Sequence, residues 1–239
     1  MESPITITKR ESKKIVGSFI GAAKSLYRSL VPIESAIFTQ TIEDDLGEHH
    51  RLLKGNVLNA GAGWRDLSPL VDGKLINQDI SYPGDTRSNI HIYSPLDQIP
   101  VADNYFDAIV CIGVIEHVEN PEAVLPEFHR VLKPQGHLIL DIPFLQPEHL
   151  CPTDFQRYTK DGIVRLAEYH GFSVSSVKGR FTVYHTLYWL AWIWLHQKST
   201  LLYLLLRPLI LNLLLFAARH SKTYSDRLAS CFQVVAVKR

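Results

Sequence analysis

The sequence predicts an α/β fold built on a doubly wound, mostly parallel sheet, and three observations carry this prediction. Short apolar segments alternate with helical patterns or polar loops over residues 56–177. Residues 106–112 form a continuous apolar run, as expected of a central parallel strand buried on both faces. The first apolar strand, 56–59, is followed by Gly61 and Gly63, which suit a sharp strand-to-helix turn.

The remaining elements follow from periodicity along the chain. Apolar residues recur every three or four positions over 13–30, which predicts an amphipathic helix, and 41–54 reads as a helix that leads into the first strand. Further helices are expected at 64–70, 121–132 and 159–170. Strands are expected at 56–59, 74–78, 90–93, 106–112, 137–142, 172–177 and 231–237. The last strand is expected to be antiparallel and to follow an apolar helical insertion.

Three parts of the chain are therefore expected. Residues 1–48 form an N-terminal helical cover segment, 49–182 and 229–239 a Rossmann-like domain, and 183–228 the apolar insertion. The basic first helix either covers its own domain or lies on an anionic membrane. The insertion either contacts a membrane or a lipid substrate, or forms an oligomer interface or internal core. A crossing helix is not expected, because 183–197 is short and Arg207 and Pro208 interrupt 201–218.

Charge and cysteine content set the expected partners. The net charge is +1, so no nucleic-acid partner is expected. The three cysteines lie far apart, which indicates neither a disulfide framework nor a zinc site. No secretory signal is recognised, so a cytoplasmic location is expected, with peripheral contact at the inner membrane face through 183–218 as one reading. A homodimer is a further expectation for the apolar insertion.

Ligands of an open α/β sheet bind beyond the carboxyl ends of the strands. Residues at four of these ends are suitable here. Gly61 and Gly63 follow the first strand, and Asp79 ends the second, where a carboxylate can accept both hydroxyl groups of a ribose. Leu96 and Asp97 follow the third strand and are placed to flank an adenine. Residues 113–117 follow the fourth strand and are expected to line the reactive end of a cofactor.

Five motifs in order carry a resemblance: 57–63, Asp79, 99–107, 115–121 and 132–138. They resemble class I S-adenosylmethionine-dependent methyltransferases of the methyltransferase domain 11 type, over about residues 50–180. The resemblance implies S-adenosyl-L-methionine as cofactor, held by Asn59, Gly61, Gly63, Asp79, Leu96, Asp97 and Ile112. Two positions depart from the family, which usually has an acid at Asn59 and often a small residue at Arg65. A nicotinamide dehydrogenase is disfavoured, because Asp66 stands where that fold needs its third glycine.

Methyl transfer from a sulfonium needs alignment of donor and acceptor and, for a hydroxyl, removal of a proton. His117 is a candidate base, although it can equally cap or pack on the following helix. The segment 147–159 resembles an Asp-Phe-x-Arg-Tyr-Thr loop found in a subset of these enzymes, and it contains a second candidate base, His149. Asp154, Arg157 and Tyr158 of this loop either bind the acceptor or form a structural clamp. No metal is expected, because His149 and Asp154 lack an obvious third ligand.

The sequence thus predicts a methyltransferase that acts on oxygen or nitrogen of a small-molecule, glycan or lipid-linked acceptor. The alternative is a methyltransferase-like subunit that does not catalyse and that binds a membrane or a complex. The changes at Asn59 and Arg65 keep this alternative open.

Overall fold

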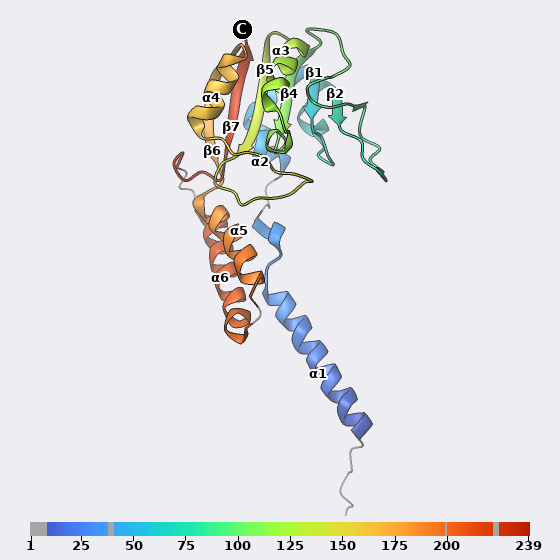
Figure 1. Ribbon diagram of the computed structural model, residues 1–239, viewed down its shortest axis with the longest axis vertical. Coiled ribbons are helices and arrows are strands. Elements are labelled where there is room, and N and C mark those ends of the chain that lie inside the picture. The colour runs from blue at the N-terminus through green and yellow to red at the C-terminus, as the bar shows by residue number, and fades with distance from the viewer. Residues whose placement is uncertain (1–8, 38–40, 199, 222–224) are drawn as a thin grey trace, which may run out of the picture.

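The computed structural model describes residues 9–37, 41–198, 200–221 and 225–239, and a seven-stranded sheet forms its centre (Figure 1). The sheet order is β3-β2-β1-β4-β5-β7-β6. The strands are β1 (Lys54–Ala60), β2 (Asp72–Asp79), β3 (Ile92–Tyr93), β4 (Phe106–Ile112), β5 (Leu132–Pro143), β6 (Phe172–Arg180) and β7 (Cys231–Lys238). Strands β1 to β5 pair in parallel, whereas β7 runs antiparallel to β5 and β6. The predicted fold class is confirmed.

The helices differ in what they cover. The α-helices are α1 (Lys9–Leu30), α2 (Ile42–Leu46), α3 (Pro121–Val131), α4 (Lys160–Tyr169), α5 (Val183–His196) and α6 (Leu201–His220). Short 3-10 turns are η1 (Glu34–Ile37), η2 (Gly47–Leu52), η3 (Ser68–Leu70) and η4 (Ile115–His117). Helices α3 and α4 pack on one face of the sheet, while α2 and η2 contribute to the core on the other.

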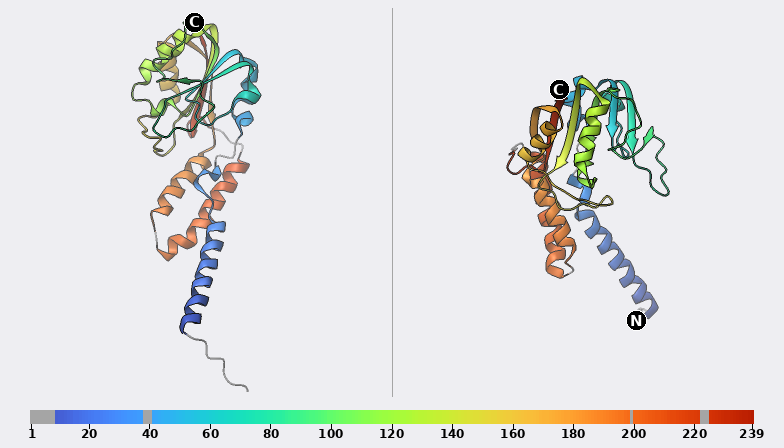
Figure 2. Two further views of the ribbon diagram at one scale, coloured as in Figure 1. Left: turned by 90° about the vertical axis from the view of Figure 1, so that its right-hand side faces the viewer. Right: turned by 45° about the horizontal axis from the view of Figure 1, so that its top comes forward.

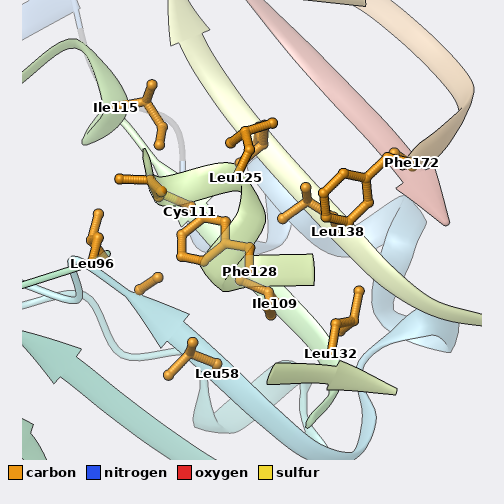
Figure 3. Packing of buried hydrophobic residues seen from close by; sticks show 14 of the residues in the cluster. Leu58, Leu96, Ile109, Cys111, Ile115, Leu125, Phe128, Leu132, Leu138 and Phe172 are labelled. Atoms are coloured by element: carbon orange, nitrogen blue, oxygen red, sulfur yellow. The ribbon is translucent and has the colours of Figure 1, made fainter. Parts of the chain in front are cut away.

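The main core lies between the sheet and helices α3 and α4. Its apolar side chains are fully enclosed, among them Leu58 and Ile109 from the strands and Phe128 from α3 (Figure 3). Continuous burial along β4 explains why its sequence is apolar without alternation. This rigid core fixes the carboxyl ends of β1, β2 and β4 along one edge, where the candidate site lies.

The helix expected at 64–70 is reduced to the short turn η3. Asp66 explains the difference, since its carboxylate accepts hydrogen bonds from the backbone N–H and the hydroxyl of Ser68, at 2.9 and 3.0 Å. Such local bonds compete with helical ones, and Pro69 follows directly. The helix expected at 41–54 is likewise divided, into α2 and η2 at Gly47. Both differences shorten the elements that flank β1.

Helices α1, α5 and α6 lie beyond one end of the sheet, with α5 and α6 side by side and α1 extending past them (Figures 1 and 2). Helix α1 points away from the domain, so it does not act as the cover expected as one reading of residues 13–30. Helices α5 and α6 form a hairpin between β6 and β7. By length and composition alone α6 is able to cross a membrane, with a mean hydropathy of 2.1 over an 18-residue window that is 17% buried.

Candidate active site

The turn after β1 presents its backbone at the carboxyl edge of the sheet. Gly61 and Gly63 have φ of 63° and 55°, in the left-handed region that favours glycine. A Cβ atom on Gly61 would lie 2.5 Å from a Val114 methyl group, so the close packing of this turn also requires glycine. The backbone N–H of Gly61 donates to Gln78 Oε1 at 3.1 Å, and that of Gly63 donates to Asp79 Oδ2 at 2.8 Å. The predicted glycines and Asp79 are therefore brought together.

Asp79 has a partner that the sequence reasoning missed. The Arg87 guanidinium, on the loop after β2, forms ion pairs with the carboxylates of Asp79 and Asp85. These carboxylates raise the pKa of Arg87, and the main cause is the hydrogen bond that Arg87 donates to Asp85. Arg87 is only 8% exposed, which is uncommon for arginine and marks a structural role. In the sequence, Arg87 is only a basic residue eight positions after Asp79, and this pattern is too common to identify a partner of Asp79.

Asn59 is fully buried and connects β1 with its surroundings. Its side-chain amide donates to Asn77 Oδ1 at 3.0 Å and to the Arg65 carbonyl at 3.2 Å. Arg65 in turn reaches across the edge, where its Nη2 donates to the carbonyl of Ile112 at 3.1 Å. Arg65 Nη1 is buried and has no hydrogen-bond partner among the described residues. An unpartnered guanidinium nitrogen beside the glycine turn is available to a carboxylate ligand.

The two residues expected to flank an adenine are placed differently. Leu96 is 6% exposed and belongs to the main core (Figure 3). Asp97 is exposed at the rim of the same edge. Of these two residues, only Asp97 is therefore open to a ligand.

The loop after β5 is fixed by a half-buried ion pair between Asp154 and Arg157. Arg157 Nη2 donates to Asp154 Oδ2 at 2.6 Å and to the carbonyl of Pro147 at 2.9 Å. The backbone N–H of His149 donates to the same carboxylate oxygen at 2.8 Å. The guanidinium of Arg157 is the main reason why the pKa of Asp154 falls to about 2. Asp154 and Arg157 thus pair with each other, as in the structural clamp that was one of the two interpretations of this loop. The pair also positions the backbone of His149.

Tyr158 also lies inside the loop rather than at an open surface. Its ring packs against the main core, and burial raises the pKa of its hydroxyl. The Gln156 amide, which the sequence reasoning did not consider, donates to the carbonyls of Ile115 and Val118 at 3.0 and 2.9 Å. These bonds tie the loop to η4. The two segments that carry the candidate bases are therefore held against each other.

Three ionisable side chains meet between η4 and this loop. Glu116 Oε1 lies 3.5 Å from His149 Nε2 and 3.8 Å from His117 Nε2. The two imidazole rings lie edge to face, with centroids 5.1 Å apart. Glu116 is 1% exposed, and its Oε2 has no hydrogen-bond partner within the described part of the chain. The sequence identified both histidines but treated Glu116 as a supporting residue, whereas the structure places its carboxylate between them.

The hydrogen bonds of the two histidines assign them different roles. His117 Nδ1 faces the carbonyl of Thr153, and because a carbonyl only accepts, this nitrogen carries the proton. His117 Nε2 faces Glu116 Oε1 at 3.8 Å. His149 Nδ1 is 3.2 Å from the Pro147 carbonyl, and the carboxylate of Glu116 is the main cause that raises the pKa of His149. His149 is therefore protonated more readily than a free imidazole, and its Nε2 faces Glu116.

Glu116, His117 and His149 are also a group able to hold a metal ion, since one ligand atom of each lies within 4.8 Å of the others. No metal was expected because the sequence showed no third ligand beside His149 and Asp154. The fold brings two candidate ligands, Glu116 and His117, close to His149. A metal ion and a proton compete for His149 Nε2, and the carboxylate of Glu116 attracts either cation. The cluster is therefore chemically suited both to proton transfer and to holding a cation.

Comparisons with known proteins bear on this arrangement. A family described as "Methyltransferase domain" matches residues 71–140. A solved S-adenosylmethionine-dependent methyltransferase from Aquifex aeolicus is similar with a TM-score of 0.53 at 17% identity, over 90% of this chain and 98% of the other. The chain has the fold of class I methyltransferases. The [4+2]-cyclase SpnF is similar with a TM-score of 0.53 at 15% identity, over 82% and 79% of the two chains. S-adenosylmethionine is the cofactor that the family match indicates.

One expectation about partners is wrong. A tRNA U34 carboxymethyltransferase from Syntrophotalea carbinolica is 37% identical over 68 residues, and two further relatives bear the same name. The exclusion of nucleic acid rested on the net charge alone, which does not report on local sites. The match spans 27% of this chain and about a fifth of that relative's length, at 20%.

Proposed function

We propose that this chain is an S-adenosylmethionine-dependent methyltransferase that methylates oxygen or nitrogen of a small-molecule, glycan or lipid-linked acceptor. The observation that carries the proposal is the cluster of His117, His149 and Glu116 beside the end of β4. In an open α/β sheet this edge is where ligands bind. The loop that carries His149, with its Asp-Phe-x-Arg-Tyr-Thr sequence, forms the acceptor side.

The residues at the edge fit the proposed cofactor. The unpartnered Nη1 of Arg65 is suited to a carboxylate, such as that of the methionine portion. Asp79 ends β2 where ribose hydroxyls are bound in related folds, and Gly61, Gly63 and Ile112 border the turn between them. When bound, S-adenosylmethionine supplies an electrophilic methyl group.

The chain's own residues then align the acceptor and accept its proton. His117 Nε2 takes the proton from the acceptor hydroxyl or amine as the nucleophile attacks. His149, whose ring nitrogens face Glu116 and the Pro147 carbonyl, holds the Glu116 carboxylate beside His117 Nε2, where this carboxylate stabilises the imidazolium that His117 forms. The Asp154–Arg157 clamp keeps His149 in this position without contacting the acceptor.

A nucleic-acid acceptor is the second candidate, and the tRNA-modifying relatives favour it. Both candidates share the donor half of the site, so the acceptor decides between them. We also propose that the protein is cytoplasmic and peripheral at a membrane face through residues 183–218, where α5 and α6 expose apolar side chains.

A transfer assay with a radiolabelled methyl donor tests the proposal. The full chain is incubated separately with lipid extract, glycan extract and bulk tRNA, and His117→Gln is the matched control. We expect label in the lipid or glycan fraction from wild type and at least about a hundredfold less from the variant. Label in tRNA instead identifies the second candidate. Binding of the donor without transfer to any fraction supports the non-catalytic alternative, and no binding by calorimetry refutes the proposal.

A further inference from the structure

The end of α1, the segment 31–37 and helices α5 and α6 form one unit, which we call the foot. A small separate core holds α5 against α6, including Tyr188, Leu211 and Leu215. The Tyr188 hydroxyl donates to the Ile33 carbonyl at 2.7 Å, and the Asn212 amide donates to the Leu30 carbonyl at 2.8 Å. The residues that end α1 are therefore fixed to the hairpin. The foot lies beyond the sheet rather than on it (Figure 2).

The foot exposes an apolar stripe along the full length of α6. Its members recur every three or four residues, and each is between 61% and 66% exposed: Leu202, Leu205, Leu209, Leu213 and Phe216. Helix α5 exposes a second set with the same spacing, Leu187, Leu190 and Trp194. Monomers rarely leave contiguous apolar surfaces of this extent in water. A stripe parallel to a helix axis fits an interface that is also parallel to that axis.

The charge around these stripes selects the kind of surface. Residues 183–220 contain no aspartate or glutamate, whereas Lys198, Arg207 and Arg219 are cationic. Helix α1 spans six lysine or arginine residues and one glutamate in sequence. A groove of about 950 Å³ between α1 and the hairpin combines apolar lining residues such as Trp192 with Arg28. Apolar surface bordered by cations is complementary to anionic phospholipid.

The topology decides between lying on a bilayer and crossing it. Arg180 of β6 pairs with Cys231 of β7, so the hairpin leaves and re-enters the sheet at the same place. If α6 crossed a bilayer, α5 would have to span it too. Helix α5 has 14 residues, or about 21 Å at about 1.5 Å each, against a hydrocarbon core of about 30 Å. The hairpin therefore lacks the length for two crossings.

We infer that the foot is a monotopic membrane seat, in which α6 and α5 lie in the plane of an anionic phospholipid leaflet. The partner is the lipid surface, and the inference does not depend on methyl transfer. One consequence rests on the proposed function: the Trp189 ring of α5 lies 5.3 Å from the His149 ring, so the foot contacts the acceptor side of the site.

Flotation with vesicles tests the seat, using the full chain with POPC alone and with a POPC–POPG mixture. We expect wild type to float with the mixture and less with POPC. The triple variant Leu205→Ser/Leu209→Ser/Leu213→Ser should lose at least about tenfold in partition. A matched control, Tyr169→Ser/Leu228→Ser, removes exposed apolar side chains outside the foot and should float like wild type. Donor binding by calorimetry confirms that each variant is folded.

Two outcomes overturn the seat. In the first, the wild-type chain binds the donor but floats with neither kind of vesicle, and light scattering shows a dimer. This result would assign the apolar stripe to contact with a second copy of the chain. The other is equal flotation of the triple variant. The in-plane orientation is tested by adding an impermeant maleimide to vesicles carrying Lys198→Cys in a Cys151→Ser chain. Modification from outside is expected, and protection of this position at the tip of the hairpin refutes the in-plane seat.

Discussion

Replacing Asp154 by asparagine measures what the acceptor-loop clamp contributes to stability. The Arg157 guanidinium lowers the pKa of Asp154 from 3.8 to about 2 in the folded chain. The difference, about 1.8 pKa units, multiplied by about 1.36 kcal/mol per unit, gives about 2 kcal/mol. Because the folded pKa is the lower one, this stability is fully present above pH 4 and is lost as the pH falls toward 2. Asp154→Asn should therefore lower the free energy of unfolding by about 2 kcal/mol at pH 7.

Urea unfolding followed by circular dichroism, at pH 7 and at pH 3, provides the measurement. Asp226→Asn is the matched control, because Asp226 pairs with Lys160 at the exposed surface. Such exposed pairs contribute about 0.2–1 kcal/mol. The gap between the Asp154 variant and wild type should narrow at pH 3. Equal stability of the two variants at pH 7, or a gap that does not change with pH, refutes the reasoning.

Three further predictions concern the site. Arg65→Met should weaken donor binding about tenfold or more by calorimetry, since hydrogen bonds to charged groups contribute about 1.5–3 kcal/mol; unchanged affinity would place the donor carboxylate elsewhere. Gly61→Ala should lower the free energy of unfolding by more than about 1 kcal/mol in thermal unfolding, because its φ is strained for alanine and its Cβ meets Val114. Gly47→Ala is the control and should not destabilise the chain, because the space around Gly47 is open. Dialysis against EDTA should leave turnover unchanged, and loss of turnover that zinc restores would assign Glu116 and His149 to a metal.

The sequence predicted those parts of the site that depend on chain direction. Parallel strands end at one edge, so Gly61, Asp79 and His117 could be assigned to a common region from strand order alone. It did not predict the contacts between loops. The carboxylate of Glu116 between two histidines depends on the loop after β5 folding back onto η4, over more than thirty residues of sequence.

Local hydrogen bonds and side-chain competition account for the other differences. Asp66 and Pro69 shorten the helix expected after the glycine turn, although the segment has helical periodicity. Arg87 lies in a loop without periodicity, and only its ion pairs with two carboxylates reveal a role. The leucines of 201–218 could have belonged to a core or a surface, because composition does not say which side of a helix is covered.

The sequence by itself determined the α/β class, the succession of strands along the chain and the glycine turn, because periodicity and backbone freedom are local properties. Tertiary structure alone decided which ionisable groups share an environment and which apolar faces remain uncovered. Both depend on distances between segments that are remote in sequence. For this chain, those distances bring Glu116 between His117 and His149, and they leave the leucine stripe of α6 facing outward.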